Sequence, residues 1–170
     1  MVGQRITIDR EAFSAAEVEA ITGISQIVLR DWRRRKFLKT KIVSNRALYY
    51  AYDLGYLMAL QALTSQGVAV GTATMAAGTA GPMIEHFAEA VSVPPADAPL
   101  VGFHGNRTAR FLIVAQDGEI VRAGFLEDWV KMRDECGKAA SAIVIDCKAL
   151  GEQIAQKAPR PVVSVKRESE

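Results

Sequence analysis

The sequence predicts an α+β protein, with a helical amino-terminal head followed by a small α/β carboxy-terminal domain. In the first half, apolar residues recur at helical spacing, and after residue 110 strand-like segments alternate with helical ones. The chain has one proline-dense stretch, residues 93–99, which lies between these parts and is typical of a linker. We therefore expect a head over residues 1–91, a linker over 92–109 and an α/β domain over 110–170.

Two short helices are predicted near the start of the head. Ser14 stands three residues before Glu17, the spacing of a capping box that opens a helix. Gly23 is expected to end this helix, and Ser25 to cap a second one. The second helix is amphipathic, with Leu29 among the residues of its apolar side and arginines on the opposite side. Two short helices joined by a tight turn predict a helix-turn-helix.

Positive charge is concentrated in and just after the second helix. The chain has a formal charge of only +2, but residues 1–80 hold ten Lys or Arg against six Asp or Glu, whereas residues 81–170 hold eleven against thirteen. Eight basic residues lie between Arg30 and Arg46, and Asp31 is the single acidic residue there. Such a high density of positive charge occurs either on a solvated surface or on a surface that a polyanion neutralises. Together with the helix-turn-helix it indicates double-stranded DNA as the partner.

Further elements are expected after the second helix. The segments 39–43 and 47–50 are short and partly alternating, so they predict a small hairpin, or wing, with a turn at Ser44–Arg46. Asp53 is expected in the first turn of a helix that runs to Leu63. Two more short helices are expected, over about residues 72–77 and 82–91.

This order of elements resembles the DNA-binding head of the MerR family over roughly residues 12–80. The matching residues are Gly23, Ile24, Ser25, Leu29, Arg30, Trp32, Tyr49, Asp53, Leu54, Gln66 and Gly67. The resemblance implies a recognition helix in the major groove and a wing on the phosphate backbone. Family members continue into a long helix that forms an antiparallel coiled coil between subunits, but no heptad run follows residue 80. We therefore expect a divergent relative that shares the head alone, such as a phage-type regulator or an excisionase-like protein.

Eight residues are candidates for contact with DNA. On the second helix, we expect Gln26, Ile27, Arg30 and Arg33 to face the groove. Gln26 and Arg30 offer paired hydrogen bonds to adenine or guanine edges. We expect the remaining basic candidates to neutralise phosphates, and they are Arg34, Lys39, Lys41 and Arg46.

The α/β domain is predicted from its own local signals. Strands over 110–115 and 119–125 flank Gln116-Asp117-Gly118, a turn typical of hairpins. The expected order continues with a helix, a buried strand, a last helix and an edge strand, at residues 126–135, 142–145, 148–158 and 162–165. We expect this domain to mediate self-association as a homodimer or to sense an effector that the sequence does not identify.

No catalytic or metal-binding constellation is expected. Asp146 and Cys147 follow the buried strand, where ligands bind in some open sheets, but Asp146 is more typical of a helix cap. His86 and His104 are isolated in the sequence. Cys136 and Cys147 are eleven residues apart, which is not a zinc spacing. We therefore expect a protein that is not an enzyme and that uses no cofactor and no metal.

The sequence predicts a cytoplasmic location and no membrane segment. The first residues contain no apolar run with a cleavage site, and the uncharged stretch 54–84 is interrupted by polar residues and glycines. The predicted function is a sequence-specific DNA-binding transcriptional regulator. Two alternatives stay open: a DNA-bending, excision or packaging adaptor of a phage or mobile element, and a protein-docking module whose arginine face meets an acidic partner.

Overall fold

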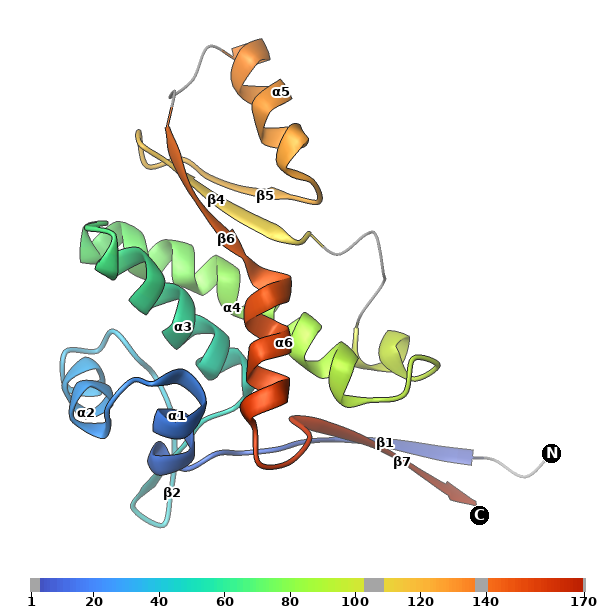
Figure 1. Ribbon diagram of the computed structural model, residues 1–170. Helices are drawn as coiled ribbons and strands as arrows, with labels where there is room; N and C mark the ends of the chain where they lie inside the picture. Colours follow the sequence, from blue (N-terminus) through green and yellow to red (C-terminus); the bar gives the residue numbers. More distant parts are fainter. Residues whose placement is uncertain (1–3, 103–108, 137–140, 170) are drawn as a thin grey trace.

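The computed structural model describes residues 4–102, 109–136 and 141–169. A helical body lies in the middle of the molecule, with a small sheet at one end and a two-stranded ribbon at the other (Figure 1). The body consists of α3 (Ala51–Ser65), α4 (Val70–Ser92) and α6 (Cys147–Lys157), which pack on one another. This mixture of helices and strands confirms the predicted fold class.

The helix-turn-helix is formed by α1 (Ala15–Thr22) and α2 (Gln26–Arg34). The Glu17 N–H donates to the Ser14 hydroxyl, and the Glu17 carboxylate accepts the Ser14 N–H at 2.7 Å, so the predicted capping box is confirmed. Gly23 ends α1 with φ of 76°, a conformation that glycine adopts without steric cost. Ser25 caps α2 by accepting the Val28 N–H.

The predicted wing is a hairpin of β2 (Lys41–Val43) and β3 (Arg46–Leu48). Ser44 and Asn45 both have positive φ values, 49° and 63°, as a two-residue type I′ turn requires. At the base of the wing, Phe13 and Tyr49 exchange two backbone hydrogen bonds and are both fully buried. The wing is therefore fixed to the start of α1.

Residues 70–92 form one helix of 23 residues, α4, so the prediction of two separate short helices at about 72–77 and 82–91 was wrong. Pro82 lies inside α4, where it lacks the N–H of a regular helix and costs about 3 kcal/mol. Several buried side chains of α4 offset this cost, each by about 1.5–3 kcal/mol, among them Met83, Ile84 and Phe87. Tertiary packing thus outweighs the local helix-breaking signal.

The three-stranded sheet has the order β5-β4-β6 and is antiparallel throughout. Its strands are β4 (Phe111–Ala115), β5 (Ile120–Ala123) and β6 (Ala142–Asp146), and α5 (Leu126–Cys136) follows β5. Leu112, Val114 and Ile145 belong to the same buried apolar cluster as the helical body. The predicted order of strands and helices in this part of the chain is confirmed.

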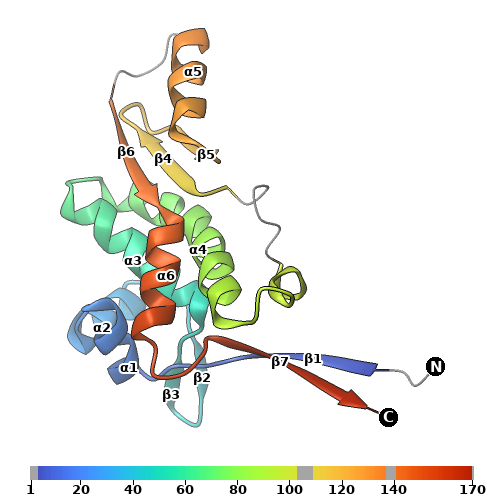
Figure 2. The same cartoon turned by 45° about the vertical axis from the view of Figure 1, so that its right-hand side comes forward.

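The ribbon pairs β1 (Gln4–Arg10) with β7 (Val163–Ser169), so that Gln4 lies opposite Ser169. An edge strand was expected at residues 162–165, but none was expected at 4–10. Figure 2 shows the ribbon extending away from the helical body. At its inner end, Arg10 donates two hydrogen bonds to the buried carboxylate of Glu89 in α4, the shorter at 2.6 Å.

Contacts among the described residues cross the boundaries that we expected between domains. Within the expected linker, Val93 and Ala98 are buried, and η1 (Ala98–Val101) packs near α4. Buried Asp97 accepts hydrogen bonds from Arg167 of β7. Because α6 also packs on α3 and α4, the carboxy-terminal segments share a core with the head. The division into independent domains remains a prediction.

Candidate nucleic-acid interface

Five of the eight predicted contact residues lie on one side of α2. A helix turns by about 100° per residue, so the five span about 120° of its circumference. Ile27, Arg30 and Arg34 are exposed, Ile27 by 76%, whereas Arg33 lies nearer the core and is half-buried. Leu29 is 1% exposed and anchors the opposite side of α2 in the core. The amphipathic pattern of the sequence thus becomes an exposed cationic face.

Gln26 lies at the first turn of α2 and connects it to α1. Its side-chain amide donates to the Glu19 carboxylate at 2.8 Å. This bond holds the amide at the start of the exposed face, with the Gln26 side chain still accessible to solvent. The base contact expected of Gln26 would require this amide to exchange Glu19 for a base.

Asp31 neutralises part of the arginine cluster. Its carboxylate pairs with Arg34 at 2.7 Å and with Arg35 at 2.8 Å, and Arg34 is the main reason that the Asp31 pKa lies below its ordinary value. The Arg34 side chain is 77% exposed. Exposed ion pairs of this kind are worth little, so a phosphate can replace Asp31 as the partner of Arg34 at small cost.

On the wing, the strand register brings two predicted phosphate contacts to one face. Lys41 pairs with Leu48, and Val43 pairs with Arg46. Because alternate residues of a strand share a face, Lys41 and Arg46 point to the same side of the hairpin, and Ile42 and Ala47 to the other. Lys41 and Arg46 are both exposed. Lys39, the last of the eight candidates, lies just before β2 and is also exposed.

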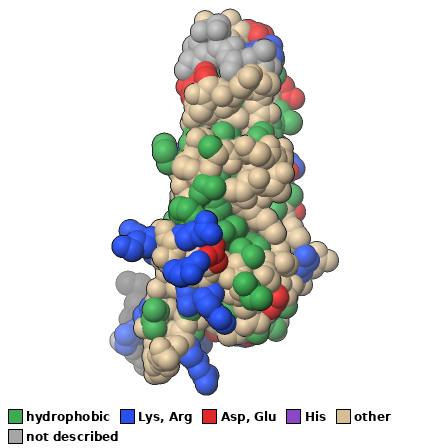
Figure 3. Space-filling view, turned by 90° about the vertical axis from the view of Figure 1, so that its left-hand side faces the viewer, with side chains coloured by type: hydrophobic (Ala, Val, Ile, Leu, Met, Phe, Trp, Pro, Cys, Tyr) green, Lys and Arg blue, Asp and Glu red, His purple; other side chains and the backbone are tan. Residues whose placement is uncertain are grey.

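The cationic side chains gather on one part of the surface. Figure 3 shows Lys and Arg side chains in the lower part of the face on which Figure 1 places α2, whereas the upper part of this face carries few Lys or Arg side chains. The charge asymmetry of the sequence thus has a spatial counterpart at the helix-turn-helix.

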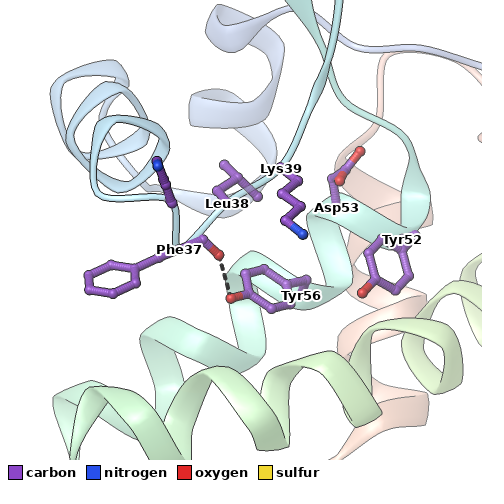
Figure 4. A pocket seen from close by; sticks show the side chains of 7 residues that line it. Phe37, Leu38, Lys39, Tyr52, Asp53 and Tyr56 are labelled. Atoms are coloured by element: carbon purple, nitrogen blue, oxygen red, sulfur yellow. Dashed lines mark hydrogen bonds between the residues drawn. The ribbon is translucent and has the colours of Figure 1, made fainter.

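A cavity of about 210 Å³ lies beside this surface, between α3 and the segment that connects α2 to β2 (Figure 4). It is lined by Lys36, Phe37, Leu38, Lys39, Tyr52, Asp53 and Tyr56. Sequence reasoning did not identify this cavity. Its one local signal is the spacing of Tyr52 and Tyr56, which places both rings on the same side of α3.

The residues considered for chemistry at the end of β6 have structural roles. Asp146 caps α6 by accepting the Ala149 N–H at 3.1 Å, as expected, and pairs with Arg110. Cys147 is fully buried, which raises the pKa of its thiol to about 12. His104 and the side chain of Cys136 lie outside the described part of the chain.

The described residues hold neither a metal-ligand cluster nor a membrane-spanning helix. Within residues 4–102, 109–136 and 141–169, three or more His, Cys, Asp or Glu side chains do not come together in a way that could hold a metal ion. In the same ranges, every helix is too short or too polar to span a bilayer.

These elements define a winged helix-turn-helix with a cationic surface. Residues 13–77 match the family described as MerR HTH family regulatory protein, and this match confirms the predicted MerR-like head. The matched segment is therefore a DNA-binding domain of the kind found in transcriptional regulators. No curated protein matches the chain.

Proposed function

We propose that this protein is a sequence-specific transcriptional regulator that places α2 in the major groove of DNA and the wing on the phosphate backbone. The observation that carries the proposal is the shared orientation of the candidate residues. Five of them lie on one side of α2, where all but Arg33 are exposed, and Lys41 and Arg46 share one face of the adjoining wing. An exposed α-helix with this cationic side fits the width of the major groove.

Within this interface, the proposal assigns two kinds of contact. Arg30 is exposed in the middle of the α2 face, where its guanidinium can read a guanine edge, and Gln26 can read adenine. Ile27 supplies an apolar contact to the bases. Arg33, which is half-buried, lies at the edge of the face and also points toward the groove. The phosphate contacts come from the other basic candidates, which are Arg34, Lys39, Lys41 and Arg46.

The proposal includes a cytoplasmic homodimer. Helix-turn-helix proteins commonly bind two half-sites through a two-fold axis that matches the symmetry of the operator. We assign self-association to the carboxy-terminal elements, of which the three-stranded sheet and α5 lie at the opposite end of the helical body from α2 and the wing (Figure 1). Light scattering at working concentration tests this part, and a monomeric mass would contradict it.

Electrophoretic shifts with specific and random duplexes test the DNA-binding proposal, once genome-wide recovery of bound DNA has supplied a specific site. Arg30→Ala should cost about 1–3 kcal/mol on the specific duplex and relax the sequence preference. Lys41→Ala should weaken binding to all duplexes and reduce the salt slope by about one. Arg5→Ala, at an exposed position of β1 outside both the candidate residues and the carboxy-terminal elements, is the control and should leave both affinities unchanged.

The outcomes separate the proposal from its alternatives. Equal losses on both duplexes for Arg30→Ala would remove the base-reading role of Arg30. Failure of the wild-type protein to bind any duplex at low salt would overturn DNA binding and favour a protein-docking module. Recovery of attachment or packaging sites in place of promoters would favour an adaptor of a mobile element.

A further inference from the structure

The cavity beside α2 has walls of two chemical kinds. One wall is aromatic, since Tyr52 and Tyr56 of α3 stack with ring centroids 6.5 Å apart and planes inclined by 24°. The other wall is cationic, since Lys36 and Lys39 belong to the basic segment between α2 and β2. Aromatic rings together with ammonium groups are complementary to a flat ring that carries a negative charge.

The aromatic wall is held in place and is partly open to solvent. The Tyr56 hydroxyl donates to the Phe37 carbonyl oxygen at 2.6 Å, which connects α3 to the segment after α2. Tyr56 is 9% exposed, whereas Tyr52 is 37% exposed. The buried ring therefore positions the cavity, and the exposed ring offers a surface on which a ligand can stack.

The cationic wall reaches the aromatic one. Figure 4 shows the Lys39 side chain extending toward the space between the Tyr52 and Tyr56 rings. Asp53 turns away from the two rings in this view and accepts the Tyr50 N–H at 2.8 Å. Burial raises the pKa of Asp53 to about 6, and this reduces its negative charge at mildly acidic pH. Lys39 is thus the group of the cavity best placed to meet an anion.

We propose that this cavity binds a small aromatic carboxylate, with its ring stacked on Tyr52 and its carboxylate paired with the Lys39 ammonium. The volume is suitable, because a cavity of about 150 Å³ accommodates benzene and this one measures about 210 Å³. The surrounding positive charge of the basic segment raises the local concentration of anions. This site goes beyond the proposed DNA contacts, of which it shares only Lys39.

Binding at this position has a mechanical consequence. Residues 36–39 connect α2 to the wing, so a ligand held between this segment and α3 constrains the position of the wing relative to α2. The ligand also engages Lys39, which the proposed function assigns to a DNA phosphate. An aromatic carboxylate should therefore weaken DNA binding, and DNA should weaken carboxylate binding by the same factor.

Titration of the full-length protein with benzoate, in the absence of DNA, tests the proposal. Amide resonances in two-dimensional NMR spectra should shift saturably for residues 36–39 and 52–56, with a Kd of about 1 mM or tighter. Cyclohexanecarboxylate, which has the same charge but no aromatic face, should bind at least about tenfold more weakly. Because no DNA is present, failure of this experiment would leave the DNA-binding proposal untouched.

Matched variants locate the site. Tyr52→Leu and Lys39→Gln should each weaken benzoate binding about tenfold, whereas Tyr52→Phe, which keeps the ring, should retain it. Lys41→Gln removes the same charge from the adjoining strand β2, outside the cavity, and should leave benzoate binding unchanged. Circular dichroism verifies that each variant is folded. If Tyr52→Leu does not fold, Lys39→Gln alone tests the site.

The opposite results would overturn the proposal. These are the absence of saturable shifts, equal binding of cyclohexanecarboxylate, equal losses for Lys39→Gln and Lys41→Gln, or shifts confined to a second cavity. That second cavity lies between the turn joining α3 to α4 and the ends of β4 and β6, and Thr72 and Gln116 are among its lining residues.

Discussion

Gly151 of α6 lies against Ile84 of α4 so closely that a Cβ atom at residue 151 would be 2.7 Å from the Ile84 carbonyl oxygen. Gly55 of α3 approaches the same residue, because a Cβ there would be 2.9 Å from the Ile84 Cβ. Ile84 is fully buried. The three helices of the body therefore meet at one residue, Ile84, and α6 joins the head through a contact that requires glycine.

Gly151→Ala should destabilise the protein by about 1–3 kcal/mol, because the added methyl group meets the α4 backbone, which cannot move aside as a flexible side chain can. Urea denaturation at neutral pH measures the change. Gly78→Ala is the matched control, since a Cβ at residue 78 of α4 has no neighbour within 4 Å. The control should stabilise the protein by about 0.5–1 kcal/mol. Equal effects of the two substitutions would contradict the close crossing.

Glu85 should make the protein less stable as pH rises. Burial is the main reason that the Glu85 pKa rises from 4.5 to about 7, and the negative charges of Glu89 and Asp53 add to the rise. The Arg10 charge and the hydrogen bond from the Tyr52 N–H lower this pKa by smaller amounts. Between pH 4.5 and about pH 7, Glu85 keeps its proton in the folded state but has lost it in the unfolded state. The free energy of unfolding therefore falls as pH rises through this range.

The measurement compares the wild type with Glu85→Gln, which keeps an acceptor for the Tyr52 N–H. Relative to the wild type, the variant should gain roughly 1–3 kcal/mol of stability between pH 4.5 and pH 7.5. Part of the pH dependence should persist in the variant, because the Asp53 pKa is raised to about 6. Parallel curves of unfolding free energy against pH would show that Glu85 is not the group responsible.

Arg160 should be important for the attachment of the carboxy-terminal segments to the head. It donates to Glu11, to Glu17 at 2.6 Å and to the Ala12 carbonyl oxygen, and its guanidinium lies over the Phe13 ring. Arg160→Ala should lower the free energy of unfolding by about 1–3 kcal/mol at pH 7. Arg122→Ala, at an exposed position of β5, is the control and should change it by less than about 0.5 kcal/mol.

The effect of Arg160→Ala should also depend on pH. Arg160 is the main reason that the Glu17 pKa falls from 4.5 to about 2. A lowered carboxylate pKa stabilises the folded state above pH 4.5, and this contribution is lost as pH falls toward 2. The stability difference between wild type and variant should therefore narrow over this range, and a constant difference would argue against the Glu17 pair.

Lys36→Gly should stabilise the protein by about 0.5–1 kcal/mol. Lys36 follows α2 with φ of 62°, and the N–H groups of Lys36 and Phe37 bond back to Arg33 and Trp32 as in a Schellman motif. Glycine is preferred at this position because it adopts positive φ without steric cost. Lys36→Ala removes the same charge but keeps the strain, so thermal denaturation should show a gain for glycine alone.

Most local elements of this protein could be predicted from the amino-acid sequence alone. Ser14, Gly23 and Ser25 predicted the limits of α1 and the start of α2, and the hairpin turn at Asp117-Gly118 joins the predicted strands. These signals can be recognised in the sequence because each depends on hydrogen bonds and backbone conformations within a few residues. The face of α2 was predictable for the same reason, since helix geometry fixes which side chains share a side.

The way in which distant segments meet depends on tertiary packing. β1 contains the β-branched run Ile6–Ile8, and it forms by pairing with β7, at the other end of the chain. α4 continues through Pro82 because α3 and α6 bury its apolar side. The cavity exists because residues 36–39 come to lie beside Tyr52 and Tyr56. Each of these features depends on contacts between residues that are far apart in the sequence. Local sequence patterns do not show which of these distant surfaces pack together.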